Sequence, residues 1–136
     1  MNRVKDALIS YRLEQAHHAL RQAEVLAGVE EWDGVVNRAY YAMFYAALAL
    51  LLTKGLGASK HTGVLALVDR EFVRPGLLPS AMSRVLRDAF NQRQRSDYAE
   101  LTPTSRERAL EILGHAREFI EAVKNVILWE REGNQP

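Results

Sequence analysis

Ala39–Leu52 reads AYYAMFYAALALLL and is the most apolar stretch of the chain. Its fourteen residues, flanked by Arg38 and Lys54, fall short of the ~20 that a helix needs to cross a bilayer. A helix that is apolar on every side but too short to span is typical of the centre of a helical bundle. The stretch therefore predicts a buried central helix, at about 33–53, and no membrane role.

Apolar residues recur at spacings of three and four on both sides of this stretch, which indicates further helices. We predict them at about 3–27, 60–73, 80–95 and 104–130, separated by short breaks that contain Gly or Pro. No segment alternates with a period of two, so no sheet is expected. The prediction is an all-α, up-and-down antiparallel bundle of about five helices, with residues 1–132 as one domain and 133–136 as a flexible tail.

Three helix starts carry possible capping residues. Asp33 can cap the second helix and Ser59 the third, because their side-chain oxygens can accept from free backbone N–H groups. Thr104 and Glu107 have the spacing of a capping box at the start of the fifth helix.

Composition excludes several kinds of chemistry. The 136 residues contain no Cys, which removes disulfides, thiolate metal sites and thiol nucleophiles and fits a cytoplasmic protein. The net charge is only +1, so a polybasic tail is excluded although a local basic patch is not. There is no phosphate-cradling Gly-rich loop and no Gly-x-Ser-x-Gly nucleophile elbow. Glu14, His17 and His18 come nearest to a metal motif, but without a second such set we predict no metal and no cofactor.

Arg38, Tyr41 and Tyr45 recur at helical steps and share one face, with Tyr40 and Phe44 on an adjacent face. An Arg at the head of so apolar a helix is expected to be largely desolvated. It then needs a carboxylate, a set of carbonyls or a bound phosphate.

Lys60 and His61 lie at the expected start of the third helix. Free backbone donors at a helix N-terminus attract anions, and these two side chains would add to that attraction. We favour an ordinary helix cap as the explanation of these residues, since nearly every helix start needs one.

The end of the fourth helix is rich in Arg. The stretch 70–95 contains six Arg and two acidic residues, a local excess of +4. Arg93, Arg95 and Tyr98 could meet phosphates and stacked bases, while a solvated charged face is the alternative. For Asp97 we favour a structural role, as the ion-pair partner of Arg38 or Arg93.

Four segments in this order resemble the HEPN domain family, over roughly 6–127. They are 37–45 (NRAYYAMFY), 61–64 (HTGV), 71–73 (EFV) and 93–98 (RQRSDY). The resemblance implies a five-helix bundle that often forms homodimers and works beside a small nucleotidyltransferase, many members being toxins or RNases. RNase-active branches of that family carry Arg-x(4–6)-His, in which Arg stabilises the phosphate charge and His transfers a proton.

Arg93 matches the Arg of that motif, but Asp97 and then Tyr98 follow where the motif continues, and no His occurs between Gly63 and Gly114. An ionised Asp is a poor proton donor. His61 would have to enter the site from another helix.

Three functions follow in order of preference. The first is a nucleotide-, RNA- or partner-binding module of a toxin–antitoxin-like pair, which binds through the residues Arg38, Tyr41, Tyr45, Lys60, His61, Arg93, Arg95 and Tyr98. The second is a metal-independent RNase toxin with an altered active site, with Arg93, Asp97 and His61 as catalytic candidates. The third is a purely structural dimerisation module.

Overall fold

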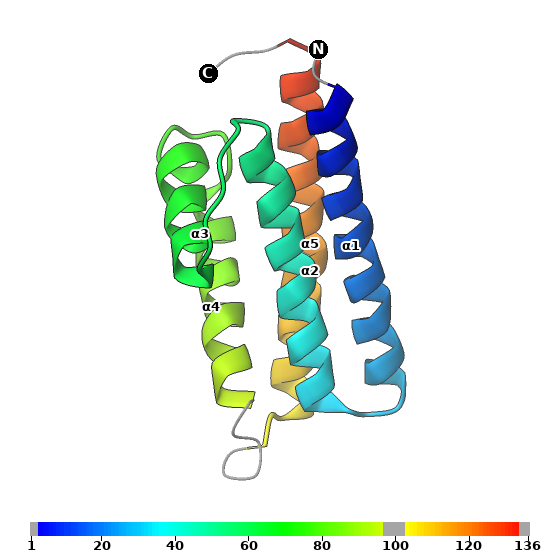
Figure 1. The fold of residues 1–136 in the computed structure, drawn as a ribbon. Helices are drawn as coiled ribbons and strands as arrows, with labels where there is room; N and C mark the ends of the chain where they lie inside the picture. Colours follow the sequence, from blue (N-terminus) through cyan, green and yellow to red (C-terminus); the bar gives the residue numbers. More distant parts are fainter. Residues whose placement is uncertain (1–2, 97–102, 134–136) are drawn as a thin grey trace.

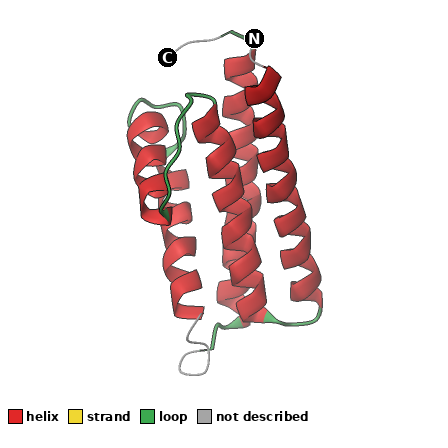
Figure 2. Cartoon of the chain, in the orientation of Figure 1, coloured by secondary structure: helices red, strands yellow, loops and turns green. Residues whose placement is uncertain are grey.

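This computed structural model describes residues 3–96 and 103–133, and most of these residues are helical (Figure 2). No strand occurs in either range, so the predicted all-α class is confirmed. The elements in chain order are α1 (Arg3–Gly28), α2 (Trp32–Leu52), α3 (His61–Val68), the π-helical segment η1 (Asp69–Val73), α4 (Ser80–Ser96) and α5 (Arg106–Arg131).

The four long helices α1, α2, α4 and α5 alternate in direction and form the predicted up-and-down bundle (Figure 1). The short helix α3 instead runs in the same direction as α2, because the segment 53–60 doubles back beside α2 before α3 begins (Figure 1). Side-chain contacts agree with this direction. The first residue of α3, His61, bonds Tyr40 in the first half of α2, whereas Lys54, just after α2, bonds the backbone oxygen of Glu71 in η1.

A glycine at the end of α2 starts this reversal. Gly55 has a φ of 67°, in the left-handed region that favours glycine. The Gly55 N–H donates to the Leu52 carbonyl and the Leu56 N–H donates to the Leu51 carbonyl, each at 3.0 Å. These two bonds form a Schellman cap, which satisfies the last carbonyls of α2 and turns the chain back.

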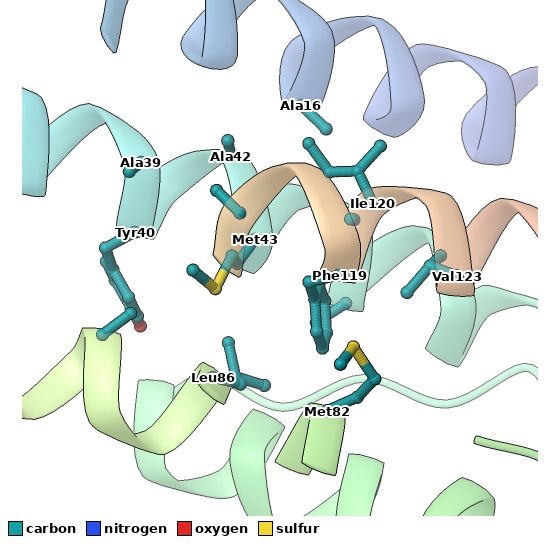
Figure 3. Close-up of a cluster of buried hydrophobic side chains, with 14 of the residues drawn as sticks. Ala16, Ala39, Tyr40, Ala42, Met43, Met82, Leu86, Phe119, Ile120 and Val123 are labelled. Carbon is teal, nitrogen blue, oxygen red and sulfur yellow. The ribbon is translucent and has the colours of Figure 1, made fainter. Parts of the chain in front are cut away.

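The hydrophobic core lies where α2, α4 and α5 meet. Tyr40 and Met43 of α2 pack there with Leu86 of α4 and Phe119 of α5, whereas Ile120 of α5 points toward Ala16 of α1 (Figure 3). The central position predicted for 39–52 is confirmed, since most of its side chains are buried. Along the seam with α1 the buried residues are small, which brings the two backbones close together; they include Ala16, Ala19, Ala23, Ala39, Ala42 and Ala46.

All three predicted caps are wrong in detail. Glu31 is the N-cap of α2, and Asp33 Oδ1 instead accepts a hydrogen bond of 3.2 Å from the Thr104 N–H, which ties α2 to the start of α5. Lys60, without a side-chain bond, takes the cap position of α3 that was expected of Ser59.

The cap of α5 falls one residue later than expected. Ser105 accepts from the Arg108 N–H at 3.1 Å, while the Thr104 hydroxyl bonds the Ser96 hydroxyl at 2.8 Å. The predicted third helix, 60–73, is also divided, because its last five residues adopt the wider π-helical turn.

By length and composition α2 passes the test for a membrane span, as apolar core helices do. It is the one helix of the described ranges that does so. Packing inside the protein buries 61% of the apolar 18-residue segment of this helix. The helix is longer than the fourteen-residue apolar stretch because polar and small residues precede that stretch.

Candidate anion-binding site

Arg38, Tyr41 and Tyr45 lie along one face of α2, as their spacing predicts. The Arg38 guanidinium carbon is 5.1 Å from the centroid of the Tyr41 ring, and the Tyr41 and Tyr45 centroids are 5.9 Å apart. All three side chains are half-buried. An Arg over a tyrosine face is held by the ring's negative quadrupole and still presents its edge to a ligand.

The expected desolvation of Arg38 is therefore partial, and its partners are amide oxygens. Arg38 Nη1 donates to Gln22 Oε1 of α1 at 3.0 Å, and Nε donates to Asn37 Oδ1 at 3.1 Å. None of the ion pairs within 3–96 and 103–133 involves Arg38. Neutral partners position the guanidinium and leave its charge available to an anion.

Arg93 of α4 contacts Tyr41 and the neighbouring Tyr40. Its guanidinium carbon lies 5.2 Å from the Tyr41 ring centroid and 5.7 Å from that of Tyr40. The Nε atom of Arg93 is buried without a hydrogen-bond partner among the described residues. Unsatisfied buried donors are rare in proteins, so this one marks a place where an acceptor is expected. Tyr41 thus contacts two cations that come from different helices.

His61 is brought to this site from α3, a placement that its sequence position left open. Its ring stacks on Phe44 with 4.2 Å between centroids, and its Nδ1 lies 2.7 Å from the Tyr40 hydroxyl oxygen. Phe90 of α4 closes the far side, 6.3 Å from the His61 ring. The stack and the hydrogen bond together fix the orientation of the imidazole.

Burial and charge shift two ionisation equilibria here. Burial raises the pKa of Tyr40 far above its ordinary value, so the phenol stays protonated at any physiological pH. Burial, followed by the positive charge of Arg93, lowers the pKa of His61 below 6.5. The imidazole of His61 is therefore neutral near pH 7, with the guanidinium of Arg93 close to it.

The remaining predicted site residues lie farther out or outside the described ranges. Lys60 and Arg95 are exposed, at the start of α3 and near the end of α4. Asp97 and Tyr98 fall outside the residues that the structure describes, and with them the predicted pairing of Asp97 with Arg38 or Arg93.

Sequence reasoning did not assign Tyr40, Gln22 or Phe90 to the site. For Tyr40 a signal existed, since a tyrosine in an otherwise apolar run needs a hydrogen-bond partner once it is buried. Nothing in the sequence marked Gln22 or Phe90, whose role depends on how the helices pack.

The arrangement suits an anion with an aromatic part and offers nothing comparable to a metal ion. Hydrogen-bond donors come from Arg38, Arg93 and His61, and they lie against tyrosine rings. Such donors bind phosphates, and such rings stack with bases. No group of three or more His, Asp or Glu side chains able to hold a metal gathers within 3–96 and 103–133. The set of residues around Tyr41 (Arg38, Tyr40, Tyr41, Phe44, Tyr45, His61, Phe90 and Arg93) is called the tyrosine site below.

The fold and these residues define a helical-bundle protein with a cationic aromatic site, and a family comparison identifies the bundle. Residues 9–126 match the family model described as the HEPN domain. The chain therefore belongs to the HEPN family, as the four sequence segments indicated.

Similar proteins occur in Thermotoga maritima and Methanocaldococcus jannaschii. A "UPF0332 protein" of Thermotoga maritima is 37% identical over 123 residues, which cover 90% of this chain and 93% of the relative. Two Methanocaldococcus jannaschii proteins are named "Putative toxin MJ0142" and "Putative toxin MJ0605". They are 34% and 35% identical, each over 85% of this chain, and the matches cover 79% and 85% of the relatives.

Proposed function

We propose that this HEPN protein acts as the toxin-like component of a toxin–antitoxin pair and binds single-stranded RNA at the tyrosine site. The names of the two Methanocaldococcus jannaschii relatives support the first part. The observation that carries the second is the buried Arg93 Nε, which has no acceptor among the described residues and lies beside Tyr41. A phosphate oxygen is one of the acceptors that a guanidinium binds most strongly.

Two features favour RNA over a lone inorganic anion. Tyr41 and Tyr45 are half-buried, so each ring keeps an accessible part on which a base can stack. Arg38 and Arg93 reach Tyr41 from different helices, so that successive phosphates of one strand can be contacted at one site. Single strands offer both the unstacked bases and the accessible phosphates.

The proposal includes two partners that the HEPN resemblance implies. One is a second copy of the chain, as a homodimer, and the other is a small nucleotidyltransferase that restrains the toxin. Co-expression with a nucleotidyltransferase encoded beside the gene, followed by affinity purification and light scattering, tests both. Separate elution of the two proteins contradicts the pairing.

RNA binding is tested with Arg93→Gln and the matched control Arg87→Gln, measured by calorimetry with an oligouridylate. Both substitutions remove one positive charge from α4, but Arg87 is exposed and lies outside the tyrosine site. We expect Arg93→Gln to weaken binding by roughly tenfold or more, since a hydrogen bond to a charged group is lost. Arg87→Gln is expected to change it less than about twofold.

Equal losses in the two variants would indicate a diffuse charge effect and contradict the site. Circular dichroism and thermal unfolding show whether both variants fold. The same variants expressed in a bacterial host test the toxin role: growth arrest by the wild type that Arg93→Gln relieves is expected, and a harmless wild type contradicts it.

RNA cleavage is the second candidate activity, favoured by one observation. The structure brings His61 into contact with Tyr40 and Tyr41, the same rings that Arg93 contacts, and thus supplies the Arg and His pair that the sequence motif lacks. Incubation of the purified protein with the oligouridylate and analysis of its length distinguish cleavage from binding alone.

A further inference from the structure

The hydrogen bond between Tyr40 and His61 determines which imidazole nitrogen faces the ligand. Tyr40 is fully buried, and among the described residues its hydroxyl bonds only His61 Nδ1, at 2.7 Å. No residue within 3–96 and 103–133 bonds the other nitrogen, Nε2, and the His61 side chain is half-exposed. Nδ1 is therefore committed to the protein interior, and Nε2 is the nitrogen left for a ligand.

Two tautomers are compatible with a neutral ring, and they differ in cost. If Tyr40 donates to Nδ1, the phenol proton is satisfied and Nε2 carries the ring proton. If Nδ1–H donates to the phenol oxygen, the phenol proton is left in the core without an acceptor among the described residues. An unsatisfied buried donor disfavours the second arrangement by about tenfold or more.

We propose that Tyr40 holds His61 as the neutral Nε2–H tautomer, so that His61 donates a hydrogen bond to a phosphodiester oxygen of the bound RNA. This inference rests on the proposed RNA-binding function. Tyr40 is a positioning residue, because it acts on the RNA through His61. Arg93, Arg38 and His61 all contact Tyr41, so His61 completes a site that presents donors and no carboxylate from the described residues.

The groups around His61 keep the ring neutral. Those that face it are Tyr40 and Tyr41 from α2 and Arg93 from α4, and Lys60 precedes it in the chain. Each is neutral or positive near pH 7, so none stabilises an imidazolium. The N-terminal position in α3 acts in the same direction, because the positive end of a helix disfavours a cation.

The tautomer also bears on cleavage. An Nε2 that already carries its proton has no lone pair with which to accept one from a ribose 2′-hydroxyl. His61 in this state binds and orients the phosphate but is no general base. The inference therefore favours binding over His61-dependent cleavage at this site.

Nitrogen-15 NMR of the histidine-labelled protein reads the tautomer directly. We expect a pyridine-type shift for Nδ1 and a pyrrole-type shift for Nε2 of His61, assigned by their loss in His61→Gln. In Tyr40→Phe, which keeps the ring and loses the hydroxyl, the two tautomers are expected to mix. A pyrrole-type Nδ1 in the wild type overturns the inference whether or not RNA binds.

Two substitutions of His61 test the donor itself. The amide of Gln extends to where Nε2 lies and can donate from there, whereas the shorter Asn reaches only the position of Nδ1. By calorimetry with a 5′-hydroxyl oligouridylate, we expect His61→Gln to bind within about threefold of the wild type and His61→Asn to bind about tenfold more weakly. Wild-type affinity in His61→Asn overturns the inference.

The pH dependence separates a neutral donor from a charged one. A 5′-hydroxyl oligouridylate has only phosphodiesters and uracil bases, which do not titrate between about pH 6 and 8, unlike a terminal phosphate with its second pKa near 6. We expect the wild-type affinity to stay parallel to that of His61→Gln across this range. Affinity that strengthens on acidification in the wild type alone indicates imidazolium binding and contradicts the proposal.

These outcomes are distinguishable from failure of the proposed function. If Arg93→Gln binds RNA as well as the wild type, the tyrosine site is not where RNA binds, whatever the tautomer is. If Arg93→Gln loses binding while His61→Asn keeps it, RNA binding stands and the role of His61 fails.

Discussion

At the scale of the residue, His61 couples the site to the stability of the fold. Its pKa is lower in the folded protein than in the unfolded chain, because burial and then Arg93 disfavour the imidazolium. Between the two values the unfolded state binds more protons, so the free energy of unfolding rises with pH there. The contribution is fully present above the unfolded pKa of about 6.5 and is lost as pH falls toward the folded value.

We therefore expect acidification from about pH 7 to pH 5 to lower the free energy of unfolding more in the wild type than in His61→Gln. Urea unfolding of both proteins at several pH values measures the difference. Carboxylates titrate near the lower end of this range in both proteins, so the comparison isolates His61. Parallel curves would show that the pKa of His61 is the same in the folded and unfolded states.

At the scale of the element, the return segment after α2 decides where His61 lies. Gly55, with a φ of 67°, ends α2 and turns the chain, and an added Cβ at that position would meet no other atom within 4 Å. Gly57 also has open space around it, but its φ lies outside the left-handed region. The two glycines thus differ in backbone conformation and are alike in surroundings.

We expect Gly55→Ala to lower the free energy of unfolding by about 1 kcal/mol, because a Cβ in the left-handed region costs roughly 1–2 kcal/mol. The control, Gly57→Ala, is expected to be neutral or slightly stabilising, since Ala restricts the unfolded chain more than Gly does. Chemical unfolding measures both. An equal loss in the two variants would mean that Gly55 has no special backbone requirement.

The elements themselves were largely predictable because each helix carries an apolar stripe or run of its own. The α5 region illustrates this, because its buried residues Ile112, Ala116, Phe119 and Val123 recur at steps of three and four. The caps were not predictable to the residue. Asp33 has the right chemistry for a cap, but the neighbouring start of α5 offers the Thr104 N–H as a competing donor.

At the scale of the whole molecule, the net charge of +1 gives no strong general attraction for nucleic acid. RNA binding must then come from a few local cations. The salt dependence of the binding constant measures how many phosphates these cations neutralise. Single strands give a slope of log K against log salt of about −0.7 for each phosphate neutralised. The slope predicted for Arg38 and Arg93 alone is about −1.4. The slope becomes about −2.8 if Lys60 and Arg95 also neutralise one phosphate each.

We expect the measured slope to fall between these values and Arg93→Gln to reduce its magnitude by about 0.7. Calorimetric titrations with the oligouridylate at several salt concentrations measure this slope. Arg87→Gln serves again as the control and is expected to keep the wild-type slope. A slope near zero would point to a neutral mode of binding and contradict the phosphate contacts.

The sequence by itself determined the helical class, the central place of 39–52 and the shared face of Arg38, Tyr41 and Tyr45, because these depend on spacing within one helix. Only the tertiary structure placed His61 and Arg93 beside those tyrosines. That placement depends on the reversal after α2, which sets α3 parallel to α2, and on the packing of α4 against α2. Contacts between helices depend on directions and registers that no single helix encodes.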